Sequence, residues 1–224
     1  LDQNYMLMAD LDLSGYSGFY INNFSGKFEG NNHVIKNINL TQSGKNGLFN
    51  AVYGTMQNVT FENVYKSNNA AYHAIVAVSN RYGKFYNVHV KNMTIEIGEN
   101  VKHSNMYVGA LIANANQANI SYCSATDITI KSVSESVGMN AGGLVGYGYG
   151  MFITNSFAQN VDISIENSVS VNGVGGLVGR EAWGGVGNIT NSYATGSIYS
   201  NSAYVGGLVG QSQGYISDSW SSVD

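Results

Sequence analysis

Gly175-Gly176-Leu177-Val178-Gly179 is the stretch that decides the fold, because the same five residues recur at 142–146 and at 206–210. Weaker versions lie upstream, so six units align on Leu48, Ile75, Leu111, Leu144, Leu177 and Leu208, and subtracting neighbours yields steps of 27, 36, 33, 33 and 31 residues. A period in this range predicts an array of stacked units. We assign these residues to the structural repeat: Leu48, Leu111, Leu144, Leu177, Leu208, Gly143, Gly176 and Gly207.

A second repeating signature is an apolar residue, one spacer and then usually Asn, as in Met56-Gln57-Asn58 and Ile153-Thr154-Asn155. We align Ile35-Lys36-Asn37 with the same signature, and Ile216-Ser217-Asp218 keeps it with Asp. Ile120-Ser121-Tyr122 departs from it. Asn tolerates left-handed backbone and can hydrogen-bond to its own copies in a stack. The signature therefore predicts corners that lie one above another.

A third strand signal such as Val161-Asp162-Ile163-Ser164-Ile165 follows in most units. A β-propeller needs four strands per blade and a period of about 40 or more, so these shorter units favour a solenoid. We expect an all-β fold, a parallel β-helix (β-solenoid) with about 33 residues per coil and three short strands per coil. We expect residues 1–40 to be cap-like N-terminal strands leading into the first coil. Residues 41–224 would be one continuous repeat array, a fragment of a longer protein.

The composition fits stacked strands. Charged residues are only 11% of the chain, glycine numbers 28 and proline is absent, as long backbone ladders require. The net charge is −4 and no basic stripe is present, so we expect no nucleic-acid partner. The single Cys123 excludes an intrachain disulfide and a cysteine zinc cluster. No run approaches 18 apolar residues, so we expect no membrane insertion.

The passage from Ile189 to Gly196, followed by Tyr204-Val205-Gly206-Gly207-Leu208-Val209-Gly210, resembles the bacterial GLUG-motif repeat proteins. Residues 5–14 and 24–40 resemble the opening of such arrays. The resemblance implies a right-handed parallel β-helix within large secreted or surface-attached bacterial proteins. These include filamentous-haemagglutinin-like adhesins and the non-catalytic N-terminal regions of IgA1-specific metallopeptidases. The repeat carries no known catalytic motif.

Catalytic and metal-binding signals are weak. The histidines His33, His73, His89 and His103 are scattered singly, and no His-Glu-x-x-His motif occurs. Asp10 and Asp12 form the best carboxylate pair, because residues i and i+2 of a strand share a face. The calcium-binding Gly-Gly-x-Gly-x-Asp repeat is missing. We therefore expect no catalytic residues, no metal and no cofactor.

Aromatic residues provide the candidate ligand-binding positions. Phe157, Tyr193 and Trp220 each follow the Asn or Asp of the second signature by two residues, so they should stack about 4.8 Å apart. Tyr107 and Tyr204 precede their glycine blocks in matching positions. One interpretation is an internal stacking ladder, and the other is an exposed platform for sugar rings or a partner protein. The candidate set is Tyr107, Phe157, Tyr193, Tyr204 and Trp220.

Two main function classes follow, and direct carbohydrate processing, as in β-helical lyases, is a third that would need an exposed acidic groove. The first is a structural and interaction module of a secreted or cell-surface bacterial protein that serves adhesion or host contact. The second is an accessory, substrate-positioning β-helix of a larger protein resembling the IgA1-specific zinc metallopeptidases, with its catalytic domain outside this chain. We expect a host glycan or glycoprotein, or other domains of the same polypeptide, as partners. End-to-end self-association is a further expectation, because an open solenoid leaves unpaired strand edges.

Overall fold

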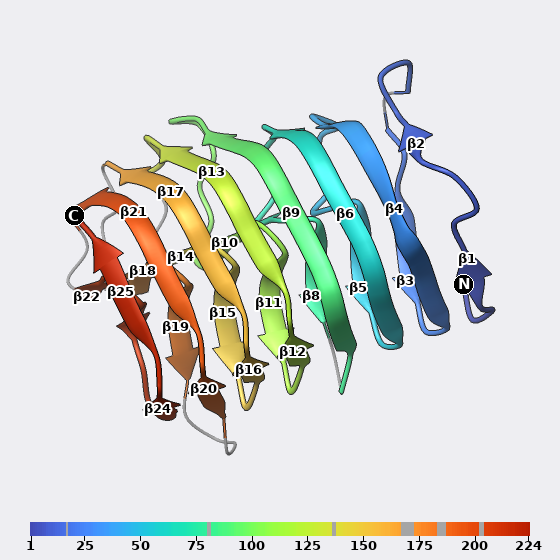
Figure 1. Cartoon of the computed structure of the whole chain (residues 1–224). Helices are drawn as coiled ribbons and strands as arrows, with labels where there is room; N and C mark the ends of the chain where they lie inside the picture. The colour runs from blue at the N-terminus through green and yellow to red at the C-terminus, as the bar shows by residue number, and fades with distance from the viewer. Residues whose placement is uncertain (17, 80–81, 136–137, 167–172, 183–186, 202–203) are drawn as a thin grey trace.

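A computed structural model of the chain describes residues 1–16, 18–79, 82–135, 138–166, 173–182, 187–201 and 204–224. These residues form 25 β-strands and no helix, and so they contain no helix of the length and apolarity that crossing a membrane requires. The strands stack into three parallel sheets that run along one solenoid (Figure 1). The predicted parallel β-solenoid is confirmed.

The first sheet contains the longest strands, which lie side by side across the front of Figure 1. Its strands are β1 (Tyr5–Met6), β2 (Leu11–Asp12), β4 (Lys27–Leu40), β6 (Thr55–Lys66), β9 (Lys84–Ile97), β12 (Asn119–Ser121), β13 (Ser124–Ser132), β16 (Phe152–Thr154), β17 (Phe157–Ile165), β20 (Asn188–Thr190), β21 (Tyr193–Ser200), β24 (Tyr215–Ser217) and β25 (Trp220–Val223). The prediction of three short strands per coil is wrong for this sheet, because β4, β6 and β9 run for 14, 12 and 14 residues.

Two smaller sheets complete the coil. The seven-stranded sheet consists of β3 (Ile21–Phe24), β5 (Phe49–Val52), β8 (Val76–Ser79), β11 (Ile112–Asn116), β15 (Val145–Tyr149), β19 (Val178–Ala182) and β23 (Val209–Gln211). The five-stranded sheet consists of β7 (Tyr72–His73), β10 (Met106–Gly109), β14 (Met139–Gly142), β18 (Gly173–Gly175) and β22 (Tyr204–Gly206).

The ladder partners show that the coils differ in length. Met56 pairs with Phe85, which is 29 positions later (85 minus 56), whereas Ile120 pairs with Ile153, 33 positions later (153 minus 120). In the described residues, the five-stranded sheet starts at β7, which lies within the 29-position step. The step from Ile189 to its partner Ile216 is only 27 positions (216 minus 189) although it contains β22. From β10 onward, each coil contributes a strand to all three sheets.

The glycine blocks form the corner between the two smaller sheets, and close backbone approach explains their glycines. A Cβ on Gly143 would lie 2.3 Å from the carbonyl oxygen of Gly176, and one on Gly176 would lie 2.3 Å from that of Gly207. Neither glycine has a positive φ. Glycine is required there because a side chain would have no room. The ladder continues through the corner, since the N–H of Leu144 donates to the carbonyl of Leu177 at 3.0 Å.

Asn forms the other corners through its left-handed backbone, as predicted. Asn58, Asn87 and Asn155 have φ of 54°, 55° and 50°, and the Asn87 Nδ2 donates to the Asn58 Oδ1 at 3.0 Å. The alignment of Asn37 with Asn58 is wrong. Ile35 and Lys36 pair with Phe61 and Glu62, so Asn37 belongs to a second column of bends. That column comprises Asn37, Asn63, Asn92, Asp127 and Asn160, all at positive φ.

The core is a continuous apolar stack inside the coils. Leu111, Leu144 and Leu177 are fully buried and Leu48 nearly so, while Leu208 is only partly buried in the last coil. One inward position breaks the apolar pattern: Lys66 stands between Leu40 and Ile95 in the ladder and is fully buried. Its Nζ donates to the Lys45 carbonyl at 2.7 Å.

Candidate binding surface

The predicted column of Phe157, Tyr193 and Trp220 is present on the long sheet. Phe157 pairs with Tyr193 and Tyr193 pairs with Trp220. Their rings are stacked, with centroids 4.9 and 4.7 Å apart and planes 2° and 4° apart. The stacking prediction is confirmed. Because the rings cover one another's faces, the column presents mainly ring edges, together with Trp220, which is 54% exposed.

Tyr107 and Tyr204 lie in one column of the five-stranded sheet, but they do not adjoin each other. Tyr107 pairs with Asn140 of the next coil. Tyr204 pairs with Gly173, which lies two coils beyond Tyr107. Tyr107 instead meets two other tyrosines. Its ring centroid lies 5.4 Å from that of Tyr72 and 4.9 Å from that of Tyr147, with planes 26° apart in the second pair. The candidate set therefore divides between two different surfaces.

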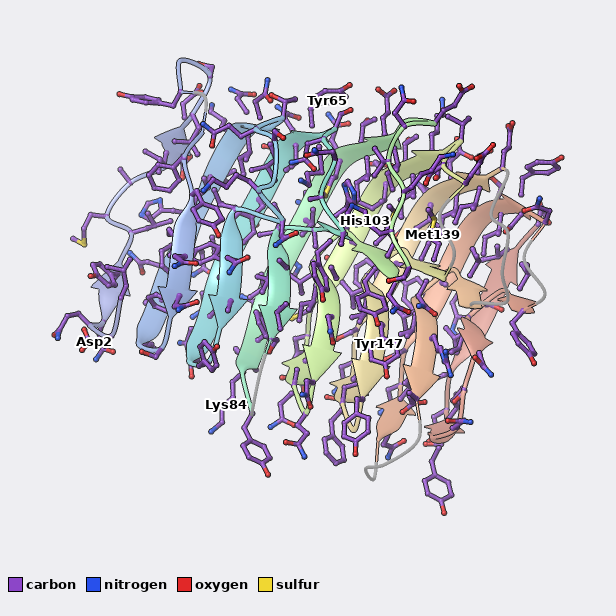
Figure 2. All side chains as sticks on the ribbon, turned by 180° about the vertical axis from the view of Figure 1, so that it is seen from behind. Asp2, Tyr65, Lys84, His103, Met139 and Tyr147 are labelled. Carbon is purple, nitrogen blue, oxygen red and sulfur yellow. The ribbon has the colours of Figure 1, made fainter. Side chains whose placement is uncertain are left out.

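Tyr147 comes from the seven-stranded sheet, so its contact with Tyr107 spans the corner between the two smaller sheets. The glycine blocks bring these sheets together: a Cβ on Gly146 would lie 2.6 Å from the Val108 nitrogen. We call the place where the outer side chains of these sheets meet the re-entrant corner. It includes Tyr72, Tyr107 and Tyr147. Tyr147 lies over the middle of the array in the view from behind (Figure 2).

A row of polar side chains continues from Tyr147 along the seven-stranded sheet. Tyr147 pairs with Asn114 on one side and with Arg180 on the other, and Arg180 pairs with Gln211. All four side chains are half-buried. We call Asn114, Tyr147, Arg180 and Gln211 the corner strip. Sequence reasoning missed this strip, although counting three residues past each Leu of the aligned glycine blocks marks all four positions.

The side chains of the corner strip make no hydrogen bond within the part of the chain that the structure describes, and the Arg180 Nε is buried without a partner. This contrasts with the Asn column of the long sheet, where Asn92 donates to Asn63 at 2.8 Å. Burial raises the pKa of Tyr107, the neighbouring tyrosines add to that rise, and the Arg180 charge opposes it. Arg180 is the ladder partner of Tyr147, so its side chain extends from the same face of the sheet one coil further on.

The histidines do not converge. His33 lies 3.0 Å from Asp10, and His103 lies 2.9 Å from the Asn69 carbonyl. His89 contacts the Ser124 Oγ at 2.7 Å. Burial lowers the pKa of His73 to about 3. The charge of His103 adds to this lowering, so His73 and His103 are neighbours, whereas His33 and His89 have other surroundings. No group of three or more His, Cys, Asp and Glu side chains in the described ranges could hold a metal ion.

Asp10 and Asp12 fasten the N-terminal segment to β4. The Asp10 Oδ1 accepts from the Val34 N–H at 3.0 Å, and this hydrogen bond is the main cause that lowers the Asp10 pKa. The Asp12 Oδ1 accepts from the Asn37 Nδ2 at 2.9 Å, which is the main cause that lowers the Asp12 pKa. The two carboxylates therefore have partners along the strand.

A cavity of about 320 Å³ lies at the N-terminal end of the solenoid. Its walls are apolar side chains of the first strands and of the core beneath them, including Met6, Phe24, Phe28 and Phe49. Ligand sites usually combine an apolar wall with a few polar groups that orient the ligand. The re-entrant corner has both kinds of group, so it is the stronger candidate.

Residues 104–131, which contain Tyr107 and Asn114, match the family model described as the GLUG motif. The chain is 29% identical over 233 residues to the immunoglobulin A1 protease of Streptococcus sanguinis. That match covers 97% of this chain but only 11% of the streptococcal protein.

A crystal structure of a Bacteroides ovatus protein described as a "putative immunoglobulin A1 protease" has the same fold. It superimposes on this chain with a TM-score of 0.65 at 22% sequence identity, covering 96% of this chain and 67% of that chain. The chain is thus a β-helical domain similar to part of proteins described as immunoglobulin A1 proteases.

Proposed function

We propose that this chain is a non-catalytic recognition module that holds a host glycoprotein for a larger protein resembling the immunoglobulin A1 proteases. The observation that carries the proposal is the match along nearly the whole chain to a small part of the streptococcal protease. A rigid solenoid suits this role, because its ladder fixes side chains on adjacent coils about 4.8 Å apart. The catalytic apparatus of such a protein would lie in other domains, and the module would act outside the bacterial cell.

Adhesion without proteolysis is the second candidate function. Tyrosines on the outer surface favour it, since Tyr82, Tyr199 and Tyr215 are 63%, 69% and 74% exposed. Tyrosine is enriched in protein recognition surfaces because it combines a large apolar ring with a hydroxyl group. Both functions need a host partner, and they differ in which partner is bound.

Binding of immobilised immunoglobulin A1 by the chain, with immunoglobulin G as the reference protein, tests the proposal. We expect selective, saturable binding of immunoglobulin A1. A folded chain that binds neither immunoglobulin, or both equally, would contradict the substrate-holding role. Binding to other host glycoproteins in place of immunoglobulin A1 would favour adhesion.

The aromatic column is tested in the same experiment by a Tyr193→Ala, Trp220→Ala double variant. Tyr16→Ala with Tyr53→Ala is the matched control, because these tyrosines are exposed and make no ring contact with another described residue. Loss of binding in the first variant alone would assign recognition to the column. Equal binding by both variants would leave the column as a stacking ladder.

A further inference from the structure

We propose that the re-entrant corner binds an acidic saccharide, with Arg180 pairing with the carboxylate of the sugar. This inference rests on the proposed function, and it names the surface and the chemistry by which the partner would be held. Tyr107, Tyr147 and Arg180 lie within the array on β10, β15 and β19, and Gln211 on the edge strand β23 completes the corner strip.

The first argument is the unused hydrogen-bonding capacity of the corner strip. Asn114, Arg180 and Gln211 make no side-chain hydrogen bond within the described ranges, and the Arg180 Nε is also shielded from water. A buried donor without a partner costs free energy. A ligand that is rich in hydroxyl groups supplies donors and acceptors for the amides, and a carboxylate supplies acceptors for the guanidinium.

The second argument is charge. None of the four ion pairs between described residues includes Arg180. Glu181, the next residue in the chain, does not supply a carboxylate to Arg180 at the corner, because its side chain is buried. It is 1% exposed, and its Oε2 accepts a hydrogen bond from Ser212 at 2.8 Å. A guanidinium favours planar carboxylate groups because it can donate two parallel hydrogen bonds. The corner therefore favours a carboxylated sugar over a neutral one.

The third argument distinguishes a saccharide from an acidic peptide. An extended peptide commonly binds by adding a strand to a free sheet edge. At the corner β15 is paired on both sides, with β11 and β19, and β10 is paired with β7 and β14. Recognition there must use side chains alone. Aromatic rings beside amides and a guanidinium suit the C–H faces and hydroxyl groups of a sugar.

Calorimetric titration of the full chain with sialyllactose and with lactose tests the proposal, because these sugars differ by one carboxylated residue. We expect sialyllactose to bind and lactose to bind at least tenfold more weakly. Poly-glutamate is the third probe. Equal affinity for the two sugars, no binding of either by folded protein, or binding of poly-glutamate alone would each overturn the proposal.

Arg180→Gln should weaken sialyllactose binding about ten- to hundredfold, as expected for the loss of a charge-assisted hydrogen bond. Arg180→Lys should recover only part of it, because an ammonium group lacks the planar fork. Lys91→Gln, an equal change of charge at an exposed position of β9, is the matched control and should not alter the affinity. An unchanged affinity in Arg180→Gln would overturn the proposal. Circular dichroism shows whether each variant is folded.

The same variants separate this proposal from the proposed function. If immunoglobulin A1 binding persists in Arg180→Gln while sialyllactose fails to bind the unmodified chain, the recognition role stands and the corner assignment falls. If sialyllactose binds through Arg180 but immunoglobulin A1 does not bind, the corner assignment stands and the partner is a different glycoprotein.

Discussion

The rings of Tyr107 and Tyr147 stack at 4.9 Å although the two residues belong to different sheets. Neither is a ladder partner of the other, because Tyr107 pairs with Asn140 and Tyr147 pairs with Arg180. The contact exists because glycines let the two sheets approach each other at the corner. The glycine block is thus both the fold signal in the sequence and the cause of the tyrosine pair.

Gly146→Ala should destabilise the fold by about 1–3 kcal/mol, since an added methyl in a packed site forces backbone shifts. The new Cβ would lie 2.6 Å from the nitrogen and 2.7 Å from the carbonyl oxygen of Val108. Urea unfolding monitored by circular dichroism measures the change. Gly98→Ala is the control, because nothing lies within 4 Å of its Cβ position. Equal stability of the two variants would refute close approach as the reason for glycine.

Leu144→Ala should lower the free energy of unfolding by about 2–5 kcal/mol, through lost burial and the cavity left behind. Leu144 is fully buried in a middle coil. Leu208→Ala makes the same change in the last coil, where the side chain is only partly buried, so we expect a smaller loss. Thermal unfolding of both variants checks the order. A larger loss for Leu208 would contradict the placement of the core.

Substitutions of Asn92 test whether the second column of bends needs a left-handed backbone. Its φ is 51°, and its Nδ2 donates to the Asn63 Oδ1 at 2.8 Å. Asn92→Gly keeps the left-handed backbone and loses only the hydrogen bond, which is worth about 1 kcal/mol. Asn92→Ala also strains the backbone by about 1 kcal/mol more. Alanine should therefore be the less stable variant in denaturant unfolding, and the reverse order would exclude a left-handed bend at this position.

Lys66 should make stability depend on pH. Burial lowers the pKa of its amine from 10.5 to about 7, so the folded state favours the neutral form. As the pH falls from about 10.5 to 7, the Lys66 amine is protonated in the unfolded chain but stays neutral in the folded chain. The free energy of unfolding therefore falls by up to about 1.4 kcal/mol per pH unit. Below about pH 7 the amine is protonated in both states, and the stability that the neutral amine gave at high pH is lost.

Lys66→Met removes this titration and places an apolar side chain between Leu40 and Ile95. We expect the variant to be more stable than the unmodified chain at pH 7 and to show a flatter pH profile between pH 7 and 10. Urea midpoints across that range measure both effects. Lys91→Met, on the exposed face of β9, should leave the pH profile unchanged. Parallel profiles for the Lys66 variant and the unmodified chain would show that the amine is solvated.

Several features of the candidate surface were beyond sequence reasoning. The alignment of glycine blocks placed Tyr107 and Tyr204 at equivalent positions, yet equivalent positions two or more coils apart do not touch. The ring that does meet Tyr107 is Tyr147, which lies on the far side of the corner. Arg180 belongs to no sequence motif that indicates binding. It enters the proposed site because its Nε is buried without a hydrogen-bond partner.

By itself the sequence determined the repeat, the parallel ladder and the stacked column of Phe157, Tyr193 and Trp220, because a solenoid places each residue beside its own copy in the next coil. It also marked the Asn corners, although Asn37 was aligned with the wrong column because Asn occupies two bends per coil. Only the tertiary structure decided where the third sheet begins and which side chains meet across the corner. Those contacts depend on the angle between sheets, and backbone packing of the glycines sets that angle.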